Sequence, residues 1–458
     1  MKMSVSPFLL TLLVLPSLWA KTTFEDHVLP IFEEHCLSCH NPDKKKGGLD
    51  LSSYPSTLAG GSSGNTLVVN DSAASLLHQV TVHQTEPVMP PEGDRIPPAQ
   101  AKLLRLWIDG GVLEHSGSQA RKQKTSALLS DFTLPVLDEA PPAHLPIGLS
   151  RAPVVTTSRS NTVADLESSP HAPLLAVTGQ RQILLYHTET LELLAIFPFL
   201  KGEGGNPQSL SFHPSGKYLT AAGGIAGKRG YAETFDVTSG KVLMTLGHEF
   251  DSVLAAALHP SMEHLALGGP SKSLKIWDTR TGEETLRLKK HPDWITALRF
   301  SADGELLASA DRNRGIQIWD GEDFSEFAHL DGHTGPVTSI QWRPDGKVLA
   351  SSSDDSHLIL WDVSQSKPIK KQKAHDAGVL DLAWHPGGYL VSSGRDRKVK
   401  FWKGNLTFRQ ELPIFDEEVT RLAFSYKGQR VFLADWHGRI HVWSVDPFKK
   451  VGMISSNP

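Results

Sequence analysis

The 458-residue sequence has only two cysteines, and its 46 basic and 50 acidic side chains nearly balance. It lacks a long apolar run beyond its first twenty residues, which excludes an integral membrane bundle. The net charge of −4 provides no general basis for binding nucleic acid. Apolar residues make up 39% of the chain, which is enough to build folded cores and excludes wholesale disorder. At roughly 150 residues per domain, this length predicts two or three domains.

Charge is distributed unevenly along the chain. Residues 21–115 contain 7 basic and 12 acidic side chains, a net charge of −5. The rest of the chain, after Lys2, contains 38 of each and is neutral. The two regions therefore differ in composition, as separate domains would.

The first twenty residues have the features of a secretory signal peptide. Lys2 precedes a short apolar run over residues 8–15, and Ala20 offers a cleavage site, although Leu18 is larger than ideal there. The run is short for a membrane span, and no cysteine follows to carry a lipid. We expect export to the periplasm, with no integral membrane segment after cleavage. An uncleaved signal, which would leave the protein membrane-associated, is the alternative.

Both cysteines lie in the segment Cys36-Leu37-Ser38-Cys39-His40, which has the spacing of a c-type haem attachment motif. Each thiol would add to one vinyl group of the porphyrin, and the short arc between them would bring His40 to the iron. A thioredoxin-like dithiol, a local disulfide and half of a zinc site are the alternatives. The dithiol lacks a strand–motif–helix context, and the zinc site lacks a second cysteine pair. We therefore predict haem c.

A single-haem cytochrome needs a second axial ligand and an apolar wall. Met89 is the only methionine between the haem motif and residue 244, and its flanking prolines would hold the thioether at low entropic cost. His78, His83, an open coordination position and a methionine that merely packs in the core remain alternatives. Further on, Pro97 and Pro98 predict the start of a helix that Gly110-Gly111 closes. Its apolar residues share one face, suited to covering a porphyrin or any other core: Ala101, Leu104, Trp107 and Ile108.

Residues 21–115 resemble the planctomycete-type cytochrome c domain, a small, mainly α fold. The segments that carry the resemblance are residues 28–32, 36–40, 46–51, 60–64, 75–77, 89–91 and 104–111. The resemblance implies one covalently attached haem c, with Cys36 and Cys39 as thioethers and with His40 and Met89 as axial iron ligands. It does not identify a redox partner. The run Lys44-Lys45-Lys46 is either a docking patch for an acidic redox partner or a solvated loop.

Residues 116–150 form a predicted linker, rich in Ser, Gln, Lys and then Pro, without an apolar period. From residue 151 to 458 the chain repeats. An aromatic residue ends a short alternating run seven times, at intervals of 49, 42, 42, 42, 41 and 41 residues. These residues are Tyr186, Phe235, Trp277, Trp319, Trp361, Trp402 and Trp443. Seven units of this length predict an all-β, seven-bladed propeller.

The repeats resemble the WD-repeat β-propeller family. The resemblance implies buried polar tetrads that fix blade geometry and are structural. The family's histidine before the first strand of a repeat corresponds to His291, His333 and His375 here. His248 is close to this position but one residue further from its strand. Turn aspartates match at 355 and 396, and on longer turns at 311 and 435, while the tryptophans stand at 277, 319, 361, 402 and 443. Units one and two lack most of these partners. In unit two, residues 223–231 are expected to form a lengthened, glycine-rich turn.

These features predict an exported protein that transfers single electrons through its haem and binds a partner protein or complex through its propeller. A haem-based sensor or a scaffold is the alternative from another class. A propeller enzyme with a haem relay is disfavoured, because the histidines occupy repeat positions and no catalytic set stands out. Two-haem nitrite reductases and quinone-dependent dehydrogenases are propellers without this periodicity. We therefore expect an electron carrier and binding protein rather than a catalyst.

Overall fold

The computed structural model describes residues 22–61, 66–70, 72–73, 75–91, 95–118, 143–158, 160–202 and 205–457. The predicted signal peptide (1–20) and most of the predicted linker (116–150) lie outside these residues. The chain forms two compact units, Met1–Gln123 and Lys124–Pro458. Within the described ranges, no helix has the length and apolar character needed to cross a membrane.

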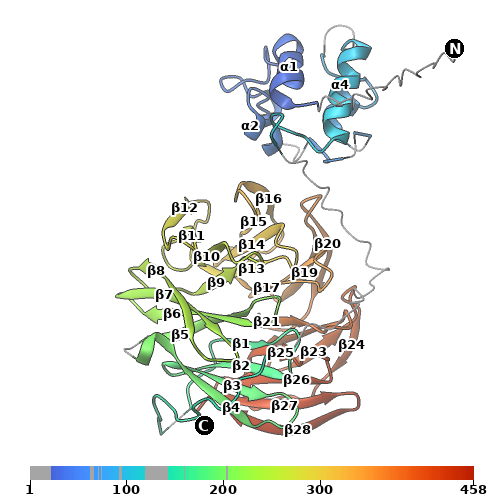
Figure 1. The fold of residues 1–458 in the computed structure, drawn as a ribbon. Helices are drawn as coiled ribbons and strands as arrows, with labels where there is room; N and C mark the ends of the chain where they lie inside the picture. Colours follow the sequence, from blue (N-terminus) through green and yellow to red (C-terminus); the bar gives the residue numbers. More distant parts are fainter. Residues whose placement is uncertain are drawn as a thin grey trace, which may run out of the picture. The chain divides into compact units, whose positions relative to one another are not determined.

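The N-terminal unit is built from short helices and turns (Figure 1). They are a π-helical turn η1 (Phe24–Val28), α1 (Leu29–His35), a 3₁₀ turn η2 (Lys46–Gly48), α2 (Tyr54–Ala59), α3 (Leu76–Thr81) and α4 (Pro98–Asp109). The helix predicted between Pro97 and Gly110 is thus confirmed as α4. Gly111 follows it at a φ of 87°, a left-handed conformation that favours glycine.

The apolar face of α4 packs into the core of this unit. Leu104, Trp107 and Ile108 are fully buried in one cluster with Phe24 and Phe32. The indole nitrogen of Trp107 donates a hydrogen bond to the carbonyl oxygen of Leu113 at 2.9 Å, so the buried ring keeps its polar atom satisfied. A parallel bridge between Thr23 and Leu113 joins the two ends of the unit.

The C-terminal unit is a seven-bladed β-propeller, as predicted. Each blade is an antiparallel sheet of four strands that follow one another in sequence. Blades 1 and 2 contain β1 (Leu166–Ser168), β2 (Leu174–Gly179), β3 (Gln182–His187) and β4 (Leu193–Pro198), then β5 (Asn206–Phe212), β6 (Tyr218–Ile225), β7 (Arg229–Asp236) and β8 (Val242–Glu249). A 3₁₀ turn, η3 (Phe199–Gly202), connects them.

The remaining five blades continue the same order. Blades 3 and 4 contain β9 (Ala255–Leu258), β10 (His264–Gly268), β11 (Leu274–Asp278) and β12 (Glu284–Leu288), then β13 (Ile295–Phe300), β14 (Leu306–Asp311), β15 (Ile316–Asp320) and β16 (Glu326–Leu330). Blades 5 and 6 contain β17 (Val337–Trp342), β18 (Leu349–Ser353), β19 (His357–Asp362) and β20 (Lys367–Lys373), then β21 (Val379–Trp384), β22 (Leu390–Gly394), β23 (Val399–Trp402) and β24 (Phe408–Glu411). Blade 7 contains β25 (Val419–Phe424), β26 (Arg430–Asp435), β27 (Arg439–Val445) and β28 (Phe448–Ser455).

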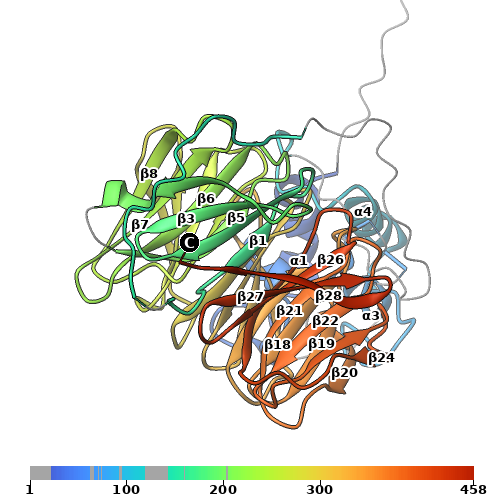
Figure 2. The same cartoon turned by 90° about the horizontal axis from the view of Figure 1, so that it is seen from below.

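The first strand of each blade contacts the first strands of both neighbouring blades, and β1 contacts β25, so the blades form a closed ring (Figures 1 and 2). The second and third strands are almost fully buried because a blade covers them on each side: β2 and β14 have no exposed residue. The outermost strands face solvent. In β20 five of the seven residues are Lys or Gln, and such charged edges discourage pairing with other chains.

The glycine-rich segment of the second repeat, residues 223–231 of blade 2, does not form the expected long turn. It extends β6 and β7, which pair as far as Ile225 and Arg229. Gly223 lies so close to Asn206 that a β-carbon there would overlap the backbone of the neighbouring strand. Glycine is therefore required here by close packing, and the extra residues lengthen two strands.

Candidate functional site

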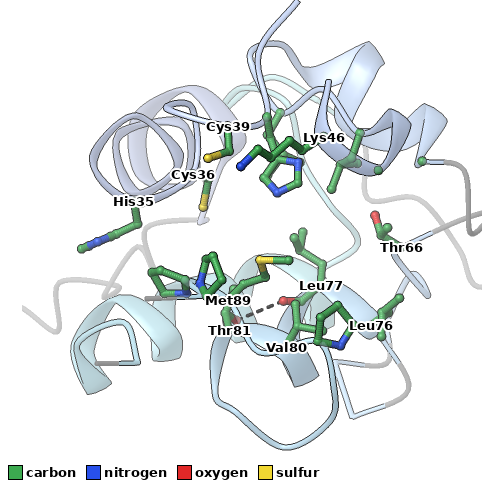
Figure 3. Close-up of a pocket in the computed structure, with 18 of the residues that line it drawn as sticks. His35, Cys36, Cys39, Lys46, Thr66, Leu76, Leu77, Val80, Thr81 and Met89 are labelled. Carbon is green, nitrogen blue, oxygen red and sulfur yellow. Dashed lines mark hydrogen bonds between the residues drawn. The ribbon is translucent and has the colours of Figure 1, made fainter. Parts of the chain in front are cut away.

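A pocket of about 500 Å³ opens in the helical unit and collects the residues that the haem motif singled out (Figure 3). Cys36, Cys39, His40 and Met89 all line it. Its remaining wall is mostly apolar and comes from several segments: Leu49, Leu51, Leu76, Leu77, Val80, Pro87, Pro90, Pro91 and Ile96. The volume is within the range of about 300–1,000 Å³ that cofactor pockets occupy.

The segment from Cys36 to His40 is held by backbone hydrogen bonds at the end of α1. Cys36 N–H donates to the carbonyl of Phe32 at 2.8 Å, and the N–H groups of Cys39 and His40 both donate to the carbonyl of Cys36, at 3.1 and 3.0 Å. The carbonyl of His40 in turn accepts from the N–H of Leu51 at 3.0 Å. This tight turn presents both thiols and the imidazole to the pocket.

The environment of Cys36 does not suit a redox-active dithiol. Burial raises the pKa of its thiol to about 11, and the residue lies at the C-terminal end of α1. Reactive dithiols instead have a lowered pKa, commonly at a helix N-terminus. The two sulfurs are not joined in a disulfide, and the described residues contain no group of three metal-ligating side chains that would make a zinc site.

Met89 extends its sulfur into the pocket on the side across from Cys36 and Cys39 (Figure 3). Its backbone N–H donates to the carbonyl of Val80 at 3.0 Å, which ties the proline-flanked loop to α3. Met89 thus reaches the same pocket as His40, from a segment about fifty residues further along the chain.

The two alternative histidine ligands are not among the residues that line the pocket. Leu76, Leu77, Val80 and Thr81 of α3 line it, and their spacing places them on one face of that helix. His78, two residues after Leu76, points elsewhere, and burial lowers its pKa. His83 follows the helix at a φ of 58°. The geometry therefore favours Met89 over both histidines.

Among the pocket residues that the sequence did not mark as functional are His35 and Thr66. His35 lines the pocket, and its Nε2 is hydrogen-bonded to Oε1 of Gln100 at 2.7 Å, which joins α1 to α4. Thr66 also lines it, and its buried hydroxyl has no hydrogen-bond partner among the described residues. Adjacency to Cys36 could have indicated His35, but no local pattern marks Thr66. The face of α4 that could have covered a porphyrin packs in the core instead.

The lysine run after the motif is partly used inside the domain. Lys44 Nζ donates to the carbonyl of Ser38 at 2.8 Å, and Lys45 lies 3.8 Å from the carboxylate of Asp50. Lys46 lines the pocket. Docking of a partner on this run stays a prediction.

The residues present fit a covalently held haem. Two free thiols, a histidine and a thioether meet in a pocket whose wall is largely apolar. The Nδ1 atom of His40 is buried without a hydrogen-bond partner in the described structure, so the protein does not tie up this ring nitrogen. Cys36 and Cys39 would hold the porphyrin, and His40 and Met89 would ligate its iron.

In the propeller, the polar tetrads form in blades 4, 5 and 6. In blade 5, Nε2 of His333 and Nε1 of Trp361 meet the hydroxyl of Ser351 at 2.7 and 2.8 Å, and Nδ1 of His333 lies 3.1 Å from Asp355. The equivalent sets are His291, Ser309, Asp311 and Trp319 in blade 4, and His375, Ser392, Asp396 and Trp402 in blade 6. These groups are saturated by one another and have a structural role.

Blades 3 and 7 depart from this pattern. The ring of His248, in β8 of blade 2, packs edge-on against Trp277 of blade 3, whose Nε1 lacks a partner in the described part of the chain. In blade 7 Asp435 does occupy the turn position, but it binds His441 at 2.9 Å and Arg439 at 2.7 Å, both from β27. The position four residues before β25 holds Phe415 instead of a histidine, so blade 7 cannot form the tetrad of blades 4, 5 and 6.

Comparison with known families agrees with both units. Residues 36–93 match the family model described as Planctomycete cytochrome C, and such a domain implies a haem cofactor. Residues 240–278, 282–320, 324–362 and 366–403 match the WD domain, G-beta repeat. No curated protein matches the chain. Each matched WD segment holds the outer strand of one blade and the first three strands of the next, so the sequence repeat is offset from the blade by one strand.

Proposed function

We propose that this protein is an exported electron carrier in which one haem c is bound through Cys36 and Cys39 and ligated by His40 and Met89, while the propeller binds a partner protein. The observation that carries the proposal is that all four of these side chains line one largely apolar pocket. When bound, the haem iron would supply one-electron oxidation and reduction.

The residues of the chain would set the conditions for that exchange. The thioether bonds would keep the group in place, and the apolar wall from α3 and the proline-flanked loop would restrict water. Ligation by both His40 and Met89 would leave no position for a substrate, which is why we propose a carrier rather than a catalyst. The signal-peptide features of residues 1–20 support the proposed export.

Covalent attachment is tested by denaturing electrophoresis with a haem stain on protein produced with the c-type maturation system. The wild type should keep its stain, and the double variant Cys36→Ala/Cys39→Ala should lose it. Ser38→Ala, between the two cysteines, is the matched control and should keep it. Haem that is extracted from the wild type by acid–acetone would contradict the proposal.

A further inference from the structure

Blade 7 lacks two of the four side chains that saturate one another in blades 4, 5 and 6. Val431 pairs with Trp443 as Leu349 pairs with Trp361, so Leu433 stands where blade 5 has its serine. Phe415 stands four residues before the first strand, at the position of the tetrad histidine. Within the described residues, Nε1 of Trp443 is consequently buried without an acceptor.

His441 is left with an unused nitrogen at the same place. Burial would raise the pKa of Asp435, but hydrogen bonds from His441 and Arg439 outweigh it and lower that pKa, so the carboxylate is ionised. An ionised carboxylate only accepts, and therefore Nε2 of His441 carries the donated proton. In the neutral ring Nδ1 is then an acceptor, and it too is buried with no partner among the described groups.

These two rings line a pocket of about 180 Å³ in blade 7. One wall is the loop before β25, and the other is made by β26, β27 and β28; the residues are Pro413, Ile414, Phe415, Asp416, Glu417, Asp435, Arg439, His441, Trp443 and Lys450. Of these lining residues, Ile414 is 63% exposed, and Trp436, which follows Asp435 in the turn after β26, is 57% exposed. Exposed large apolar side chains beside a polar pocket are typical of protein-binding surfaces.

The unused atoms define the chemistry that would occupy the pocket. The indole of Trp443 is a donor and needs an acceptor, whereas Nδ1 of His441 needs a donor. A single amide group carries both, as a carbonyl oxygen and an N–H. A buried polar group without a partner is unfavourable, so a ligand that satisfies both atoms would recover part of that free energy.

We propose that the blade 7 pocket binds an amide group of a partner peptide, with the carbonyl oxygen on Trp443 and the N–H on His441. This deepens the proposed role of the propeller and rests on it. Phe415 controls access, because its ring packs edge-on against both rings, with centroids 5.5 Å from His441 and 6.4 Å from Trp443. The backbone N–H of Phe415 donates to the carbonyl of Arg397 at 3.0 Å, so rotation of the side chain could admit the ligand while the loop stays in place.

The test is nuclear magnetic resonance of the full chain with ¹⁵N-labelled tryptophan. The probes are two tripeptides, glycine-asparagine-glycine and glycine-leucine-glycine. Each is N-acetylated and ends in a C-terminal N-methylamide, so that only the asparagine side chain supplies a primary amide. The indole signal of Trp443, assigned with Trp443→Phe, should shift and saturate. The signal of Trp277, which also lacks a partner but lies in blade 3, should not move. Phe415→Ala should bind severalfold more tightly.

Each outcome has a defined meaning. A shift with the asparagine peptide alone assigns the site to side-chain amides, and an equal shift with both peptides assigns it to main-chain amides. The double variant Phe415→His/Leu433→Ser, which installs the tetrad residues of the other blades, should abolish either shift. The proposal is overturned if neither peptide moves the Trp443 signal in the wild type or in Phe415→Ala. Because the readout does not involve haem, such a result would leave the electron-transfer proposal standing.

Discussion

His40 and Met89 reach one pocket from segments that are held in different ways. His40 is part of a turn closed by backbone hydrogen bonds on both sides: its N–H donates to Cys36, and its carbonyl accepts from Leu51. Met89 is attached through one backbone hydrogen bond to Val80 and through its neighbouring prolines. The thioether is thus the ligand with the weaker attachment, and the one whose replacement is most informative.

We expect Met89→His to lower the midpoint potential while the iron remains six-coordinate, because a thioether favours ferrous iron more than an imidazole does. Met89→Ala should open a position for carbon monoxide or cyanide. Redox titration and absorption spectroscopy measure both effects. His78→Ala and His83→Ala are the controls and should keep the methionine–iron charge-transfer band. If the oxidised wild type lacks this band, or if a histidine variant loses it, Met89 is not the ligand; carbon monoxide binding by the wild type would favour a sensor.

Two adjacent serines of blade 6 allow the tetrad to be tested at a single position. The hydroxyl of Ser392 contacts His375 and Trp402 at 2.9 Å each, whereas the equally buried hydroxyl of Ser393 has no partner in the described structure. Ser392→Ala should lower the free energy of unfolding by about 2–4 kcal/mol, because it leaves two buried groups unsatisfied. Ser393→Ala should be neutral or stabilising. Urea denaturation measures both, and equal losses would refute the structural role of the tetrad hydroxyl.

At the scale of elements, histidines in the turns after first strands connect neighbouring blades. His213, His259 and His385 each accept a backbone N–H of their own turn at Nδ1, at 3.1, 3.0 and 2.7 Å. Each Nε2 lies 3.0–3.1 Å from a carbonyl oxygen of the next blade, on Pro260, Gly304 and Gly428. This arrangement requires the neutral ring, because a proton on Nδ1 would oppose the backbone N–H.

The propeller should therefore lose stability through these histidines as the pH falls. Burial lowers the pKa of all three, that of His385 to about 4, from an ordinary value of 6.5. The unfolded chain takes up these protons first, so the contribution of His385 is complete above pH 6.5 and declines between pH 6.5 and about 4. Urea denaturation across this range should show a flatter profile for His385→Gln than for the wild type.

His437, which is exposed and makes no bond between blades within the described part of the propeller, provides the control, and His437→Gln should not flatten the profile as His385→Gln does. Glu167 changes stability with the opposite sign, so that its contribution increases as the pH falls. Burial raises the pKa of its carboxyl to about 7, despite Arg299 at 3.3 Å. For this reason the difference between variant and wild type is the quantity to compare. Parallel profiles for His385→Gln and the wild type would contradict the role of His385.

For the whole molecule, closure of the ring depends on contacts between the two ends of the propeller. Among the described strands, none is exchanged between blades 1 and 7. Instead Asn457 bonds to the backbone of Thr157 through both ends of its amide, at 2.6 and 3.4 Å, and the hydroxyl of Ser456 donates to the carbonyl of Asn161 at 2.7 Å. An apolar cluster that includes Leu175 and Phe432 spans the same junction.

Ser456→Ala/Asn457→Ala should accordingly loosen the junction between blades 1 and 7. Three hydrogen bonds at about 1 kcal/mol each correspond to a loss of about 3 kcal/mol. Hydrogen exchange should become faster in β1 and β28 before other blades are affected. Ser364→Ala, which removes a bond to Asp362 within one turn of blade 5, should change exchange only there. Uniform acceleration in all blades would show that these contacts do not act as the closure.

Several features follow from local sequence and could be predicted from it. The spacing of Cys36, Cys39 and His40 needs only a few consecutive residues, and the prolines and glycines that bound α4 act on their own backbone. The propeller period repeats seven times, so errors in single units do not obscure it. The tetrads of blades 4, 5 and 6 likewise follow from residues at constant offsets.

Only the tertiary structure could decide the rest. Met89 lies in the pocket and His78 does not, because α3 turns its other face inward. The glycines of blade 2 lengthen β6 and β7 instead of their turn, because Asn206 of the neighbouring strand β5 packs closely against Gly223. Asp435 binds His441 of β27 because blade 7 lacks the tetrad histidine that would otherwise be its partner. The ring closes through Asn457 and Thr157, which are too distant in sequence for a local pattern to pair them. Local pattern therefore determines which elements form, whereas packing between distant segments determines which side chains meet.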